Sequence, residues 1–209
     1  MHAGHHTVRL AGPGDLQAVA TLVVEGFRDQ FEPIFGGRMS EAGEIMRRWI
    51  ELEHELGGVS TLVVDRDPPA DGIAASVGVR TGISREEELA QGLWQALRDS
   101  LGFWRASWSM FLLSYPRYRV NPSEAYIERL VVDEDCRRRG LARSLLREAE
   151  ELGRRAGKRS AGLHVSGVNR PAIELYESAG YEAISRERSL VTSSFLGVRY
   201  WVYLKKRLS

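Results

Sequence analysis

The segment AYIERLVVDEDCRRRGLARSLLREAEELGRR, residues 125–155, decides the fold. An apolar strand pattern over residues 126–132 leads through an arginine-rich turn into an amphipathic helix over residues 140–155. A second strand pattern follows at residues 160–166. A strand, a helix and a strand within so short a span predict a βαβ unit, whose strands are parallel and joined by a right-handed crossover.

The rest of the chain adds strands and helices on both sides of this unit. Alternating or continuous apolar patterns predict strands at residues 7–11, 59–65, 72–80, 181–190 and 197–204. Helical spacing of apolar residues predicts helices at residues 16–27, 40–56, 84–102, 103–113 and 169–179. Residues 29–39 carry Pro33, Gly36 and Gly37, and are predicted to form a loop. We expect one α/β (α+β) domain over residues 1–209, a mixed sheet flanked by helices.

Composition narrows the class of protein. The 209 residues hold 29 basic and 28 acidic side chains and are 43% hydrophobic, which excludes a wholly disordered chain. The net charge of +1 argues against a protein that coats nucleic acid. The single cysteine, Cys136, excludes an internal disulfide and a multi-cysteine zinc site. No apolar run approaches a membrane span or a signal peptide, so we expect a cytoplasmic protein without metal or membrane partner.

The turn Arg137–Ala142 is a candidate anion site. The start of a helix leaves backbone N–H groups unpaired and carries a partial positive charge. Gly140 would let a phosphate approach the backbone closely. Residues 137–159 hold nine basic and three acidic side chains, a local charge of +6. The turn is neither a P-loop nor a dinucleotide fingerprint, and the plainer alternative is a solvated helix start.

Two motifs in this order resemble the GNAT superfamily of acetyl-CoA-dependent N-acetyltransferases. Arg137, Gly140 and Ala142 match the first, fourth and sixth positions of its Gln/Arg-x-x-Gly-x-Gly/Ala signature. A second family element is matched downstream by Asn169, Ala172, Leu175, Tyr176, Gly180 and Tyr181. The resemblance implies a GNAT-like mixed sheet that splays between its two parallel strands. In this arrangement a helical insertion, at about residues 84–115, lies between the third and fourth strands.

The resemblance also implies acetyl-CoA as co-substrate, bound in the notch of the splayed sheet. The backbone N–H groups of residues 138–143 would bind the pyrophosphate, residues 130–132 would pair with the pantetheine arm, and Asn169 would orient that arm or the adjacent helix. The residues expected to bind acetyl-CoA are Leu130, Val131, Val132, Arg137, Arg138, Arg139, Gly140, Leu141, Ala142, Arg143, Asn169 and Tyr176.

The expected reaction is direct attack of a primary amine on the thioester in a ternary complex. The resemblance assigns the general acid to Tyr176, and a core tyrosine is the alternative interpretation. The resemblance places His164 where some protein-acetylating relatives have a glutamate base, and an ordinary histidine pKa of about 6.5 suits that role. Glu128 is the competing candidate, and a polar residue with a structural role is the alternative interpretation of either one. Alternation places Tyr126, Glu128, Leu130 and Val132 on one face of their strand, and Gly162, His164 and Ser166 on one face of theirs.

The acceptor is expected to be an amine-bearing small molecule or peptide. In this fold residues 29–39, residues 189–198 and the insertion are the candidates to line its site. Asp29, Glu32 and Glu128 are candidates to attract an amine; Phe31, Phe35, Trp104 and Trp108 are candidates to contact an apolar neighbour. The apolar insertion is also a candidate homodimer interface. A catalytically silent acyl-CoA-binding regulatory module is the alternative function, and a nucleic-acid-binding domain is a weaker one.

Overall fold

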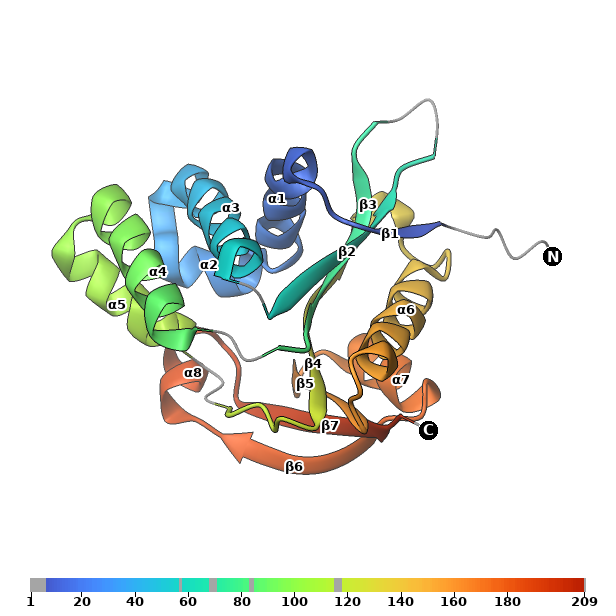
Figure 1. The fold of residues 1–209 in the computed structure, drawn as a ribbon. Coiled ribbons are helices and arrows are strands. Elements are labelled where there is room, and N and C mark those ends of the chain that lie inside the picture. The colour runs from blue at the N-terminus through green and yellow to red at the C-terminus, as the bar shows by residue number, and fades with distance from the viewer. Residues whose placement is uncertain (1–6, 57, 68–70, 83–84, 115–117, 209) are drawn as a thin grey trace.

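A seven-stranded mixed sheet forms the centre of the protein (Figure 1). The computed structural model describes residues 7–56, 58–67, 71–82, 85–114 and 118–208. Its strands are β1 (Val8–Leu10), β2 (Val59–Asp65), β3 (Ile73–Arg80), β4 (Glu124–Val132), β5 (Ser160–Ser166), β6 (Glu182–Arg188) and β7 (Tyr200–Arg207). They lie in the order β1-β2-β3-β4-β5-β7-β6, and β4 and β5 pair in parallel whereas every other neighbouring pair is antiparallel. The βαβ unit and the mixed sheet are therefore confirmed.

Helices cover both faces of the sheet. They are α1 (Leu16–Gly26), α2 (Arg28–Phe35), α3 (Met39–Leu56), α4 (Glu86–Leu101), α5 (Phe103–Leu113), α6 (Leu141–Arg155), α7 (Arg170–Ser178) and α8 (Leu190–Phe195). Helices α1 to α5 lie on one side and α6 and α7 on the other (Figure 1). Helices α4 and α5 form the insertion between β3 and β4, and its expected first and last residues, 84 and 115, lie outside the described residues. No helix in the described ranges is long and apolar enough to cross a membrane.

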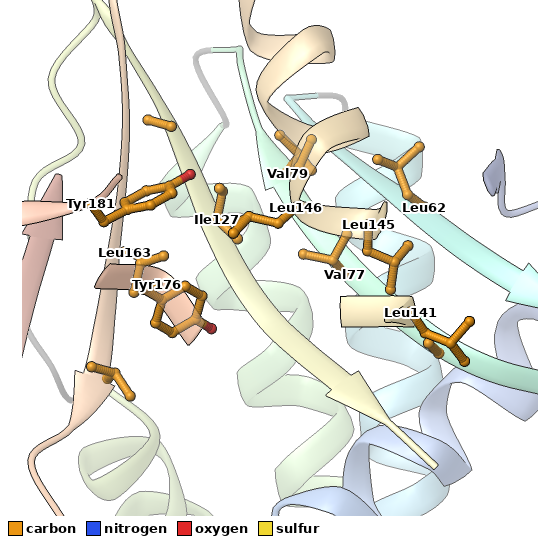
Figure 2. Close-up of a cluster of buried hydrophobic side chains, with 14 of the residues drawn as sticks. Leu62, Val77, Val79, Ile127, Leu141, Leu145, Leu146, Leu163, Tyr176 and Tyr181 are labelled. Carbon is orange, nitrogen blue, oxygen red and sulfur yellow. The ribbon is translucent and has the colours of Figure 1, made fainter. Parts of the chain in front are cut away.

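Each face of the sheet has its own hydrophobic core. On one face, Leu141, Leu145 and Leu146 of α6 pack against Val77 and other strand residues (Figure 2). On the other face, the apolar sides of α1, α3 and α4 pack together with strand residues such as Val63 and Val131. Helix α1 approaches β4 closely at Gly26. A Cβ atom built on this residue would lie only 2.2 Å from Val131 Cγ2. The sheet is thereby buried between two helical layers.

The prediction of a loop over residues 29–39 is wrong. Residues 28–35 form helix α2, with Pro33 inside it, and a single 3₁₀ turn, Gly36–Arg38, follows. Proline removes only one N–H group from this short helix. The side chains of Phe31 and Phe35 are one helical turn apart and both are buried, with ring centroids 5.9 Å apart. Burial of this pair outweighs the proline.

The prediction that Tyr126, Glu128, Leu130 and Val132 share one face of their strand is also wrong. Arg129 has a φ of 54°, and the register with β3 shifts between Ser76 and Gly78. A bulge of this kind exchanges the faces of the residues that follow it. Ile127, Leu130 and Val132 consequently pack against the α6 core, whereas Val131 packs against the α1 core.

The α6 core supports the βαβ unit, and its loss should therefore be costly. Leu145 is fully buried. We expect Leu145→Ala to lower the free energy of unfolding by about 2–5 kcal/mol, because it leaves a cavity beneath the sheet. Urea denaturation followed by circular dichroism measures this change. The exposed Arg147 on the same helix supplies the control, and an Arg147→Ala variant as destabilised as Leu145→Ala would contradict the assignment of the core.

Candidate active site

The two parallel strands diverge after a short paired stretch. Residues 124–126 of β4 pair with residues 160–162 of β5, and the described ladder ends there. Strand β5 continues along β7 as far as Ser166, while β4 continues along β3 as far as Val132. One edge of β4 beyond Tyr126 therefore faces the gap, with backbone groups that can bind an extended chain. This is the edge on which residues 130–132 are expected to hold the pantetheine arm.

The arginine-rich turn leads from β4 into α6. After a 3₁₀ turn, Glu134–Cys136, the chain passes Arg138 at a φ of 62° and Gly140 at a φ of 84°, and α6 begins at Leu141. A Cβ atom built on Gly140 would meet nothing within 4 Å, so the space in front of the helix start is open. The unpaired N–H groups of a 15-residue helix point toward such a space. The turn therefore fits a pyrophosphate group.

The arginine side chains of the turn differ in their contacts. Arg137 donates to the carbonyl oxygen of Val132 at 3.4 Å, and Arg139 donates to that of Asp135 at 3.0 Å. The first contact ties the turn to the end of β4, and the second ties it to the preceding 3₁₀ turn. Arg138 is exposed, and within the described ranges its guanidinium group has no hydrogen-bond partner. Its charge is available to an incoming anion.

Helix α7 places Tyr176 between the diverging strands. The side chain of Asn169 caps this helix by accepting a hydrogen bond from the backbone N–H of Ala172 at 3.2 Å. Figure 2 shows the Tyr176 ring beside Leu163, with its hydroxyl group on the side toward β4. Burial raises the pKa of Tyr176, and the hydroxyl has no hydrogen-bond partner among the residues described. Tyr176 therefore carries its proton at neutral pH and can donate it.

A cavity of about 640 Å³ is lined by residues of β4, β5 and α7 together with residues of the helical layer. Its lining includes Leu130, Asn169 and Tyr176, together with both candidate bases, Glu128 and His164. The three residues predicted to be catalytic thus border one cavity, beside the unpaired edge of β4. The described residues hold no group of three or more His, Cys, Asp or Glu side chains that could bind a metal ion.

His164 is held as a neutral imidazole. Its Nδ1 atom lies 2.9 Å from the hydroxyl of Tyr126, and its Nε2 atom is buried without a partner among the described residues. Its ring stacks on Tyr203 with centroids 4.9 Å apart. Burial lowers the pKa of His164 to about 4, although the nearby Glu124 carboxylate opposes this shift. At neutral pH the ring can accept a hydrogen bond, but it binds a proton only weakly.

Glu128 belongs to a network of charged side chains. Its carboxylate lies 3.2 Å from the guanidinium group of Arg80 and 3.5 Å from that of Arg129. Arg129 also makes a two-pronged ion pair with Glu53 of α3, whose side chain is fully buried. The two carboxylates and two guanidinium groups balance in charge. The network fixes Glu128 at the border between the sheet and the helical layer.

Several residues of this site were missed by the sequence analysis. Glu124 accepts a hydrogen bond from the hydroxyl of Tyr203 at 2.6 Å and pairs with Lys205 at 3.0 Å. The hydroxyl of Tyr118 lies 3.1 Å from the same carboxylate. No spacing pattern marks this cluster, because its members come from three separate segments. Glu53 was detectable, since it occupies a position on the apolar stripe of α3 where a charge needs a partner.

The residues expected to line the acceptor site divide in two groups. Phe31 and Glu128 line the cavity. Asp29, Glu32, Phe35, Trp104 and Trp108 do not, and the side chains of Trp104 and Trp108 are 84% and 39% exposed. The cavity lining includes residues of α2 from the segment 29–39, and Leu196 from the segment 189–198.

The buried imidazole makes stability depend on pH. The unfolded chain binds a proton on His164 below about pH 6.5, whereas the folded protein resists binding it until about pH 4. The free energy of unfolding should therefore fall as the pH is lowered from 6.5 to 4. We expect His164→Gln to flatten this fall in urea denaturation across that range. His54→Gln is the control, because burial also lowers the pKa of His54 and its removal should leave the His164 contribution intact. An unchanged pH dependence in His164→Gln would show that the ring is not held neutral.

Solved structures resemble this chain over almost its whole length. A ribosomal-protein-alanine N-acetyltransferase from Brucella melitensis matches with a TM-score of 0.65 at 15% sequence identity, covering 97% of this chain and 99% of that one. The structure of yncA from Salmonella typhimurium, solved with its cofactor acetyl-CoA, matches with a TM-score of 0.62 at 16% identity, covering 97% and 94%. At these identities the likeness shows the fold, which is the splayed sheet expected from the motifs.

Sequence comparison identifies the family. The chloroplastic GCN5-related N-acetyltransferase 4 of Arabidopsis thaliana is 38% identical over 60 residues, which are 29% of this chain and 21% of that protein. The match thus spans about a fifth of the length of that relative. The model of the acetyltransferase (GNAT) family matches residues 73–181, from the start of β3 through the arginine-rich turn to the end of the Tyr176 motif. The chain belongs to the GNAT acetyltransferase family.

Proposed function

We propose that the protein transfers an acetyl group from acetyl-CoA to a primary amine of a small molecule or peptide. One observation carries this proposal: the unpaired edge of β4 leads through the arginine-rich turn to the open start of α6, and that edge borders the same cavity as Tyr176. The edge of β4 suits the pantetheine arm of the co-substrate, and the start of α6 suits its pyrophosphate. The hydroxyl of Tyr176 would supply a proton where the thiolate leaves.

The residues that would hold acetyl-CoA come from three elements. Backbone N–H groups of residues 138–143 would bind the pyrophosphate, with the exposed charge of Arg138 beside them. The edge of β4 at residues 130–132 would pair with the arm, and Asn169 would hold α7 in place by capping it. When bound, acetyl-CoA supplies an acetyl group activated as a thioester.

The amine must lose a proton to react. An alkyl amine with a pKa of about 10.4 is mostly protonated at pH 7, and the neutral form costs about 4–5 kcal/mol. Glu128 and His164 both border the cavity. The pKa of about 4 makes His164 a poor acceptor of this proton. We assign the proton acceptor to Glu128, because its carboxylate borders the cavity and can accept hydrogen bonds from the ammonium group, and we assign to His164 the role of orienting the hydroxyl of Tyr126.

Tyr176 would donate a proton to the departing thiolate. Its hydroxyl remains protonated at neutral pH, because burial of the side chain raises its pKa. It also has no partner among the described residues that would compete for the proton. A donor held at a fixed position typically contributes 10²- to 10⁴-fold to such a step.

A thiol-release assay with acetyl-CoA and a panel of primary amines tests the activity and the role of Tyr176 together. We expect Tyr176→Phe to lower kcat by about 10²-fold or more while the Kd of acetyl-CoA changes little. Tyr181→Phe is the matched control, because this buried tyrosine packs at 6.0 Å from Tyr176 but does not line the cavity.

Other outcomes of the same assay would contradict the proposal. A large loss of acetyl-CoA affinity in Tyr176→Phe, measured by calorimetry, would make this tyrosine structural. Binding of acetyl-CoA without transfer to any amine would favour the catalytically silent module. Absence of binding to the folded protein would remove both functions.

A further inference from the structure

The cavity has two ends of different chemistry. At the sheet end its lining includes the polar side chains of Glu128, His164 and Tyr176. The cavity extends from the sheet into the layer formed by helices α1 to α5, where its lining includes Phe27, Phe31 and Met46. Among the described residues of α1 to α5 that line the cavity, none carries a charge. Gln30 is the one amide side chain among them. The helical end is therefore an apolar compartment that opens directly onto the candidate active site.

The inserted helices form one wall of this compartment. Helix α4 contributes Leu89, Ala90 and Leu93, and α5 contributes Met110. Leu93 is buried, whereas Ala90 is exposed at the border of the cavity. Without α4 and α5 this side would be open to solvent. The insertion thus adds a wall to the space beside α1, α2 and α3 and turns it into a cleft.

We infer that the acceptor is a primary amine carried on a bulky apolar body, such as an alkyl or aryl-alkyl amine. This inference rests on the proposed function. The amino group would lie beside Glu128, at the border of the two ends, where the carboxylate can accept its N–H groups. The body would fill the compartment between α2, α4 and α5, where burial of hydrocarbon is favourable.

The charge of the compartment supports this occupant. A peptide rich in charged side chains would find few partners there, because the charged residues of the lining, Arg80, Arg119, Glu128 and Arg129, all lie outside helices α1 to α5. The network of Glu128, Arg80, Arg129 and Glu53 is balanced in charge and borders the compartment on the sheet side. A hydrocarbon body needs no further partner. A long acyl chain on the acyl-CoA donor has similar chemistry and would also suit the compartment. The experiment distinguishes such an acyl chain from the apolar body of the amine.

A series of amines from ethylamine to hexylamine, with phenethylamine, tests the inference in the thiol-release assay. We expect kcat/KM with acetyl-CoA to rise by about two- to fourfold for each added methylene until the compartment is filled. Equal kcat/KM for ethylamine and phenethylamine would overturn the inference while leaving acetyl transfer intact.

Binding measured without turnover separates this inference from the proposed function. Phenethylamine should bind the complex of the protein with CoA, as followed by calorimetry. Ala90→Phe, which fills the border of the compartment, should weaken this binding by about tenfold or more. Gln91→Phe is the matched control, an exposed neighbour on α4 outside the lining, and should leave binding within about twofold.

Two further outcomes distinguish the inference from the proposed function and from an acyl-chain site. Selective binding of phenethylamine without transfer would support the compartment and refute the activity. Unchanged phenethylamine binding in Ala90→Phe, with a selective loss of hexanoyl-CoA turnover relative to acetyl-CoA, would place an acyl chain there and overturn the inference.

Discussion

The buried ion pair between Arg129 and Glu53 is the interaction on which the site depends. Arg129 stands in β4 with a positive φ, a conformation that costs a residue with a side chain about 1 kcal/mol or more. Its guanidinium group is held by both carboxylate oxygens of Glu53 and lies over the ring of Trp49 at 5.6 Å. Loss of either partner would leave the other charge buried and unpaired, which typically costs about 3–5 kcal/mol, so α3 and β4 hold each other in this arrangement. Helix α3 therefore stabilises the bulge in β4.

The bulge has consequences for both faces of the sheet. It turns Val131 toward α1, where Gly26 leaves room for it, and it turns Leu130 and Val132 toward α6. A bulge also increases the local twist of its strand. The end of β4 accordingly leaves β5, which stays paired with β7. The gap between the strands and the helical compartment both border β4 near the bulge, and the arginine-rich turn follows the end of the same strand.

Much of this arrangement is predictable from the sequence. The strand at residues 160–166, the helix at 140–155 and the placement of His164 opposite Leu163 and Val165 follow from hydrophobic periodicity, because these segments keep one regular spacing. The matched family motifs indicate the splayed sheet. Periodicity fails at Arg129, because a bulge in a strand leaves no pattern in hydropathy. It fails again in α2, because the proline and glycines signal a loop while the burial of Phe31 and Phe35 is decided by tertiary packing.

The site was predictable only in part, for a related reason. Tyr176, His164 and Glu128 belong to the βαβ unit and its motifs, so their proximity follows from local order. Tyr118, Glu124 and Tyr203 meet through hydrogen bonds between distant segments. The compartment likewise depends on how α4 and α5 dock, which no local pattern specifies.

Hydrogen exchange of the backbone amides, with and without acetyl-CoA, tests the central claim most directly. The claim is that the free edge of β4 and the start of α6 hold the co-substrate. Saturating acetyl-CoA should slow exchange in residues 127–132 and 138–143, and should leave β1 and β2 unchanged. Binding of acetyl-CoA with no slowing in either segment would contradict the account.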